Sequence, residues 1–148
     1  MKWLLDTNVV SEHVRPHPNN AVIEWVARRS PEQIAVSDVT IAELRIGAMT
    51  TPDDRRRRQL TRWLDDELSA MLGRNALPVT LEILIEWLQL GRNLSAVGRT
   101  RAPPDLLIAS TARVHDLIVV TRNVRDFDGT GVTLYDPWTG KTHVMDAA

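Results

Sequence analysis

Four carboxylates far apart in the sequence are the residues best suited to chemistry: Asp6, Glu43, Asp105 and Asp126. Like charges that converge repel one another, and their convergence becomes tolerable chiefly when a cation neutralises them. The sequence contains no cysteine, and its four histidines lack the spacing of a zinc site. Any metal must therefore be held by oxygen, and several carboxylate oxygens suit Mg²⁺, for which Mn²⁺ can substitute.

Each of these acids also has a purely structural interpretation. Asp6, just before Thr7, is a suitable helix cap, and Glu43 is a typical solvated helix residue. Asp105 in a first helical turn is stabilised by the helix dipole, and Asp126 suits a loop cap. The functional interpretation depends on the convergence of all four, which requires a fold that brings distant segments together.

Short apolar strands alternate with helices along the chain, which predicts an α/β fold with a mostly parallel sheet of about five strands covered by helices on both faces. The segment after residue 90 is polar and contains glycine, so 91–102 is the expected flexible loop. We expect one domain over residues 1–138 and a poorly ordered tail over 139–148. Pro78 places the third strand at a sheet edge. The expected strands are 3–5, 34–36, 77–79, 117–120 and 132–134, and the expected helices are 7–13, 19–29, 38–49, 52–72 (ended by Gly73), 80–90 and 105–115.

The expected elements bring the four acids to one edge of the sheet. Binding crevices in such sheets lie at the carboxyl ends of the strands. Asp6 directly follows the first strand, and Asp126 follows the fourth by a few residues. Glu43 lies early in the helix after the second strand, and helical side chains tilt back toward the amino end. Asp105 opens the helix that runs against the fourth strand, so its start also lies at that edge.

At these residues the sequence resembles the PIN-domain VapC toxins. The resemblance covers about Met1 to Trp138 and implies a PIN-like three-layer fold, in which Asp6, Glu43 and Asp105 are the metal-binding acids. It also implies that four polar residues position a water or the substrate: Thr7, Asn8, Thr121 and Asn123. The resembling blocks, in order and spacing, are Leu4–Asn8, Thr40–Gly47, Pro104–Ala109 and Val120–Phe127.

The fourth acid departs from the family pattern. Many PIN domains carry an aspartate directly after a threonine-x pair, where this chain has Asn123. Either Asp126 fills that position, or Asn123 supplies a neutral oxygen and Asp126 holds the loop. An amide ligand would weaken a second metal, so the sequence leaves one and two metals open.

Together these features predict a Mg²⁺-dependent endoribonuclease, the toxin of a toxin-antitoxin pair, which hydrolyses RNA by metal-activated water and leaves a 5′-phosphate and a 3′-hydroxyl. The resemblance implies a homodimer and a cognate antitoxin protein lying across the acidic groove, with an antitoxin arginine among the acids. Arginines near the acids are candidate RNA phosphate contacts, with ordinary surface charge as the alternative: Arg99, Arg101, Arg122 and Arg125.

The position of Asp6 after the first strand is also compatible with two other functions. Phosphoryl-aspartate enzymes need a second aspartate two residues after the first, where this chain has Asn8, and a lysine near the later strands, whereas its lysines are Lys2 and Lys141. A non-catalytic RNA- or partner-binding module remains the alternative, and it requires that the four acids have no catalytic role.

The remaining features of the sequence concern the expected cytoplasmic location, the run of arginines and the tryptophans. Its apolar stretches are strand-sized, and Asp6 interrupts any signal-peptide region, so we expect no membrane association. The run Arg55 to Arg58 is expected to form a solvated helix face paired with Asp54. Four of the five tryptophans are expected in the core or an interface: Trp3, Trp25, Trp63 and Trp87.

Overall fold

The sheet is the frame of the molecule. The computed structural model describes residues 1–72 and 75–148 and has six strands in the order β3-β2-β1-β4-β5-β6. Neighbouring strands from β3 to β5 are parallel, and β6 is antiparallel to β5. The mostly parallel sheet predicted from the sequence is confirmed. The strands are β1 (Trp3–Leu5), β2 (Ile34–Ser37), β3 (Ala76–Leu77), β4 (Ile118–Val120), β5 (Thr133–Asp136) and β6 (Lys141–Val144).

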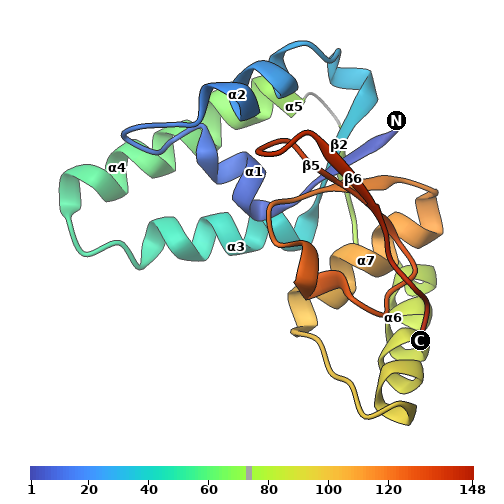
Figure 1. The fold of residues 1–148 in the computed structure, drawn as a ribbon. Coiled ribbons are helices and arrows are strands. Elements are labelled where there is room, and N and C mark those ends of the chain that lie inside the picture. The colour runs from blue at the N-terminus through green and yellow to red at the C-terminus, as the bar shows by residue number, and fades with distance from the viewer. Residues whose placement is uncertain (73–74) are drawn as a thin grey trace.

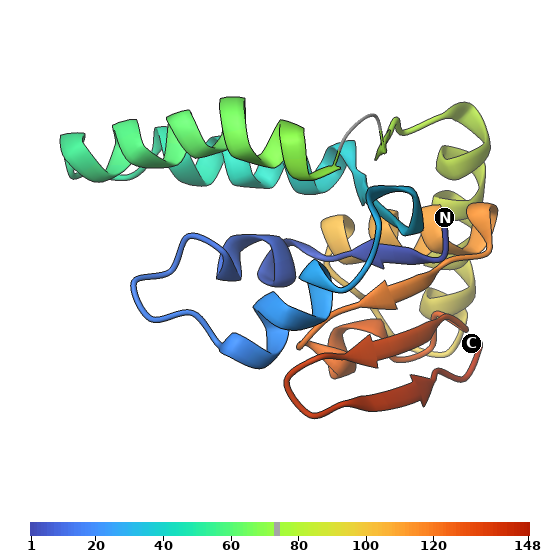
Figure 2. The same ribbon diagram turned by 90° about the horizontal axis from the view of Figure 1, so that it is seen from above.

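Helices cover both faces of the sheet (Figure 2). Because successive strand residues point to opposite faces, Leu4 and Val119 pack against α6 (Leu81–Ala96) and α7 (Pro103–His115). Leu5 and Val120 pack on the other face, in a cluster to which helices α1 to α3 and the segment after α4 contribute. The bounds of the other α-helices are α1 (Thr7–Glu12), α2 (Asn20–Ala27), α3 (Asp38–Met49), α4 (Asp54–Arg62) and α5 (Ser69–Leu72).

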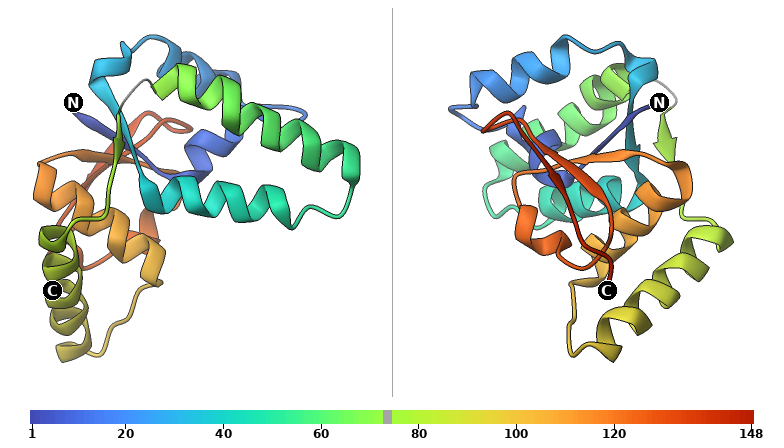
Figure 3. Two further views of the ribbon diagram at one scale, coloured as in Figure 1. Left: turned by 180° about the vertical axis from the view of Figure 1, so that it is seen from behind. Right: turned by 45° about the vertical axis from the view of Figure 1, so that its right-hand side comes forward.

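Helices α3 and α4 form a long hairpin that projects from the body of the molecule (Figures 1 and 3). The sequence allows either Ser37 or Asp38 to cap α3, and the Ser37 side chain is the cap. The single helix expected over 52–72 is divided, because a π-helical segment, Trp63–Leu68, separates α4 from α5. Gly73, expected to end this helix, lies outside the described residues.

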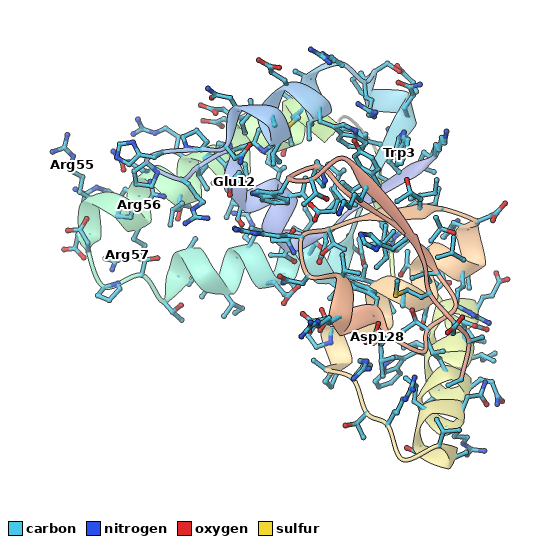
Figure 4. All side chains as sticks on the ribbon, viewed as in Figure 1. Trp3, Glu12, Arg55, Arg56, Arg57 and Asp128 are labelled. Atoms are coloured by element: carbon cyan, nitrogen blue, oxygen red, sulfur yellow. The ribbon has the colours of Figure 1, made fainter. Side chains whose placement is uncertain are left out.

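The arginine run occupies the first turn of α4. Figure 4 shows Arg55, Arg56 and Arg57 at the outer end of the α3–α4 hairpin, well away from Asp128. Arg57 pairs with Asp54, and the Arg56 guanidinium donates to the Val14 carbonyl. These contacts agree with the expected solvated helix face, on which an arginine pairs with an aspartate of the same helix.

The loop expected from residue 91 is wrong in its first half. Helix α6 continues through Gly91 to Ala96. Glycine in a helix interior costs about 1 kcal/mol relative to alanine. Leu90 and Leu94 are buried in the core against α7, and their burial offsets that cost.

The poorly ordered tail expected after residue 138 is also wrong, because residues 141–144 form β6 and raise the strand count to six. A tight turn joins β5 to β6, with Gly140 at φ +73°. Most β6 side chains are exposed, so the strand is stabilised by its backbone pairing with β5 and carries no apolar alternation. A sequence pattern based on burial could not detect it.

The order in which the strands are added reverses direction in the middle of the sheet. From β1 the chain moves outward through β2 to β3, whose edge position agrees with the prediction from Pro78. From β4 it moves outward in the other direction through β5. The central strands β1 and β4 therefore flank a topological switch point, where ligands bind in sheets of this kind.

In the described part of the chain, no helix has both the length and the apolar character needed to cross a bilayer.

Candidate active site

Asp6 lies at the centre of the switch point. It follows β1, caps α1, and is only 4% exposed. Its Oδ1 accepts from the backbone N–H of Thr7 at 2.8 Å. Its Oδ2 accepts from the Asn8 side-chain amide at 3.0 Å and from the Thr121 hydroxyl at 2.7 Å. These contacts fix the carboxylate between the ends of β1 and β4.

Asn8 and Thr121 join the two central strands into one polar network. The Asn8 amide also donates to Thr121 Oγ1 at 3.1 Å, and its Oδ1 accepts from the Arg122 backbone N–H at 3.1 Å. Thr121 Oγ1 accepts from the Asn123 backbone N–H at 3.0 Å. Three of the predicted substrate-positioning residues therefore hold each other and Asp6 in place, and Asn123 takes part through its main chain.

Glu43 is linked to this network by the fourth predicted positioning residue, Thr7. The Thr7 hydroxyl donates to Glu43 Oε1 at 2.7 Å, which connects α1 with α3. The fully buried Thr40 lies beside it, with its Oγ1 3.4 Å from that of Thr7. The sequence analysis did not select Thr40, although its position three residues before Glu43 puts both on one side of the helix.

Asp105 experiences the charge of all the other acids. It is half-buried in the first turn of α7. Burial, followed by repulsion from Asp6, Asp126 and Glu43, raises the pKa of its carboxyl to about 6. The pKa of Asp6 is also raised, chiefly by burial and further by Glu43, against the opposing effect of its hydrogen bonds. The structure thus brings together the four predicted acids.

Asp126 reaches this cluster from a short 3-10 helix, Val124–Phe127. The Asp126 side chain is exposed, and its charge contributes to the raised pKa of Asp105. Phe127 is completely buried in the core and anchors the helix from below. Asn123 precedes this helix and has no side-chain capping bond. Both candidates for the fourth position therefore lie at the site.

The donors fit a hard divalent cation in kind. They are carboxylate oxygens with hydroxyl and amide neighbours, and burial, followed by repulsion among the acids, raises the pKa values of Asp6 and Asp105. Over residues 1–72 and 75–148, no three Asp, Glu, His or Cys side chains are arranged so that they could hold a metal ion as they stand. Both Asp6 oxygens and Glu43 Oε1 instead accept hydrogen bonds from protein groups.

The four candidate arginines differ in their surroundings. Arg101 donates to the Asp128 carbonyl at 3.0 Å and braces the loop between α6 and α7 against the segment after the 3-10 helix. Arg99 and Arg125 are exposed. The Arg122 guanidinium carbon lies 5.3 Å from the centre of the Trp138 ring. Arg122, whose backbone is part of the Asp6 network, is therefore the best positioned of the four.

Trp138 is a residue at this edge that the sequence analysis missed. It follows β5 as Asp6 follows β1, so it lies at the same carboxyl edge of the sheet. Its position after a strand is the available indication, but the strand predicted there ends at residue 134, four residues before Trp138, whereas β5 extends to Asp136. The other tryptophans behave as predicted, with Trp63 buried and Trp3 packed edge-to-face on Trp25.

The raised pKa of Asp105 predicts a pH-dependent gain in stability for Asp105→Asn without metal. The folded protein binds the Asp105 proton more tightly than the unfolded chain, so wild type should lose stability as pH rises from about 4 to about 6. The variant cannot ionise there, so it should melt a few degrees higher than wild type above pH 6 and equally below pH 4. Melting curves in EDTA across this range measure the difference. Asp128→Asn is the control, and an equal gain in both variants would contradict the local repulsion.

Comparisons with known proteins agree with this geometry. Residues 3–131 match the family described as PIN domain. The chain is 32% identical to Toxin FitB of Neisseria gonorrhoeae, over 91% of this chain and 97% of that toxin, and 32% identical to VapC ribonuclease Y4jK of Sinorhizobium fredii, over 91% and 96%. The crystal structure of FitAcB from N. gonorrhoeae superposes with a TM-score of 0.86, at 32% identity over 92% of this chain and 98% of that chain. The chain therefore belongs to the PIN domain family.

Proposed function

We propose that this protein is a metal-dependent endoribonuclease that acts in the cytoplasm as the toxin of a toxin-antitoxin pair. The observation that carries the proposal is the convergence of Asp6, Glu43, Asp105 and Asp126 at the switch point, where Asp105 responds to the charge of the other three. Relatives named as ribonucleases and toxins support RNA as the substrate.

In the proposed mechanism, Asp6, Glu43 and Asp105 would hold Mg²⁺, and Asp126 or Asn123 would supply a fourth ligand. When bound, the ion supplies positive charge that acidifies water and offsets the charge developing on the scissile phosphate. Thr121 and Asn8 orient the Asp6 carboxylate, and Thr7 orients Glu43. No histidine in the described part of the chain hydrogen-bonds to these acids, so we expect 5′-phosphate products; 2′,3′-cyclic phosphate products would contradict this mechanism.

We further propose that an antitoxin protein covers the acidic groove. Structures similar to this chain are complexes named FitAcB, FitAB with a DNA fragment, and VapBC. A cavity of about 460 Å³ between α1, α3 and α4 is lined by the polar Thr7 and Glu43 and by apolar residues that include Leu44, Leu60 and Trp63. An apolar segment of an antitoxin fits this cavity, with a cationic side chain directed at the acids.

A homodimer is also proposed, and the outer face of α6 supports it. The sequence makes the apolar helix segment from Ile83 to Leu90 a candidate interface, but Ile83 and Leu90 themselves are buried within the chain. The adjacent face leaves Leu81, Ile85 and Leu88 largely exposed, and contiguous exposed apolar residues mark interaction surfaces.

Calorimetric titration of Mn²⁺ into antitoxin-free protein tests the metal site without knowledge of the RNA. Wild type should bind, and Asp105→Asn should lose binding because the site loses a charged ligand. Asp128→Asn, outside the cluster, should bind like wild type. No binding by wild type, even with a phosphate-bearing oligonucleotide, would overturn the nuclease proposal and favour a non-catalytic RNA- or partner-binding module.

A further inference from the structure

We propose that Arg122 and Trp138 form a nucleotide-binding subsite beside the acids, in which the Trp138 ring stacks on a base and Arg122 binds the adjoining phosphate. The inference rests on the proposed ribonuclease function and adds a residue that positions the substrate. Trp138 lies beyond residues 3–131, the part of the chain matched by the PIN domain family.

The position of Arg122 relative to the acids is fixed by its backbone. Its N–H donates to Asn8 Oδ1, and the Asn8 amide donates to Asp6 Oδ2. The preceding residue, Thr121, donates directly to Asp6. A phosphate bound by the Arg122 side chain would therefore have a defined place next to the phosphate that is cleaved.

The Arg122 guanidinium is available for such a contact. It rests over the Trp138 ring, with its central carbon 5.3 Å from the ring centre. In the described part of the chain, no carboxylate lies within ion-pair distance of it, although it is close in the fold to an acidic cluster. Its planar set of N–H donors suits a phosphate.

Trp138 lies in the turn between β5 and β6, at the same edge of the sheet. The Trp138 backbone N–H donates to Asp136 Oδ1 at 2.8 Å, and the Gly140 N–H donates to the Asp136 carbonyl at 2.8 Å, which closes the turn. The ring is half-buried and packs against the core cluster that contains Val120, and the Arg122 guanidinium lies over it. A rigid, partly exposed indole beside an arginine has the composition of a single-strand stacking platform.

Equilibrium binding to a fluorescein-labelled single-stranded oligoribonucleotide tests the subsite. The measurement uses Asp105→Asn as background, so that binding is read without cleavage. Adding Trp138→Ala should weaken affinity roughly five- to a hundredfold, and Trp138→Phe should restore most of it because a phenyl ring also stacks. Adding Arg122→Ala should reduce the dependence of log K on log salt by about 0.7, one phosphate contact, whereas Arg92→Ala on α6 should not.

An abasic nucleotide moved along the same oligonucleotide separates stacking from a structural role. Where the missing base is the one that stacks, the protein with Trp138 should lose affinity, and Trp138→Ala should lose no more. Fluorine NMR of 5-fluorotryptophan protein should show an RNA-dependent shift of the Trp138 resonance, with that of Trp87 as the internal control.

The outcomes distinguish the two proposals. Equal affinity of Trp138→Ala and its background, or no effect of the abasic site at any position, would overturn the subsite. Arg122 and Trp138 would then stabilise the β5–β6 hairpin or contact a protein partner. If wild type still cleaves RNA in that case, the nuclease function stands. Absence of RNA binding and cleavage in wild type would overturn both.

Discussion

Asp6→Asn is expected to lower the rate of RNA cleavage by about a thousandfold while the protein stays folded. The asparagine Oδ1 can still accept the Thr7 N–H, so the cap of α1 is kept. Its amide carries no charge and would direct N–H groups at Asn8 and Thr121, which now donate to Asp6. Loss of about 4 kcal/mol of charge stabilisation corresponds to that factor. Single-turnover cleavage of a labelled RNA in excess Mg²⁺ measures it.

Asp128→Asn is the matched control for this substitution. Asp128 belongs to the same segment as Asp126, but its carboxylate lies 3.9 Å from Arg101 and outside the acidic cluster. It should cleave within a fewfold of wild type, and circular dichroism should show both variants folded. If Asp6→Asn retains more than about a tenth of the wild-type rate, the central role of the buried carboxylate is refuted.

Phe127→Ala should cause the largest loss of stability, about 3–5 kcal/mol, because its ring is completely buried and a cavity remains when it is removed. Small domains have only about 5–15 kcal/mol of stability, so the variant should unfold at much lower denaturant or temperature. The 3-10 helix that carries Asp126 ends at this residue, so cleavage should fall as well. Urea unfolding of the two proteins measures the difference in free energy.

Phe127→Leu separates volume from aromatic character. Leucine fills most of the space, so the loss should stay below about 1.5 kcal/mol and cleavage should be nearly kept. A loss below about 1 kcal/mol for Phe127→Ala would instead mean that the surrounding core, including Leu94 and Leu106, closes over the gap.

The sequence located the acids because each has a simple relation to an element. Asp6 follows a strand, Glu43 lies early in a helix after a strand, and Asp105 begins a helix that runs back along the sheet. These relations depend on the direction of the strands and helices, which the alternation of apolar runs and helix starts indicates, and they do not require the strand order. The metal-binding and catalytic roles of these residues stay predictions, because geometry alone does not test them.

The features that escaped prediction depend on contacts distant in sequence. Helix α6 continues past Gly91 because Leu94 finds a core to pack against. Strand β6 exists because β5 offers a free edge. Trp138 joins the site only because that hairpin is formed, and Thr40 matters only because α1 brings Thr7 against α3. None of these neighbours is visible in the local pattern.

The pairing of β1 with β4 has a consequence for how the protein is made. Asp6 and its partner Thr121 are 115 residues apart, so synthesis supplies the first long before the second. Contacts of such long range form late in folding, because the entropy cost of closing a large loop precedes the stabilisation that the contacts provide. A ribosome-bound or prematurely released fragment that lacks β4 cannot assemble the acidic centre. If the proposed ribonuclease function holds, the nascent polypeptide is expected to leave the RNA around it uncut until most of its length has been translated.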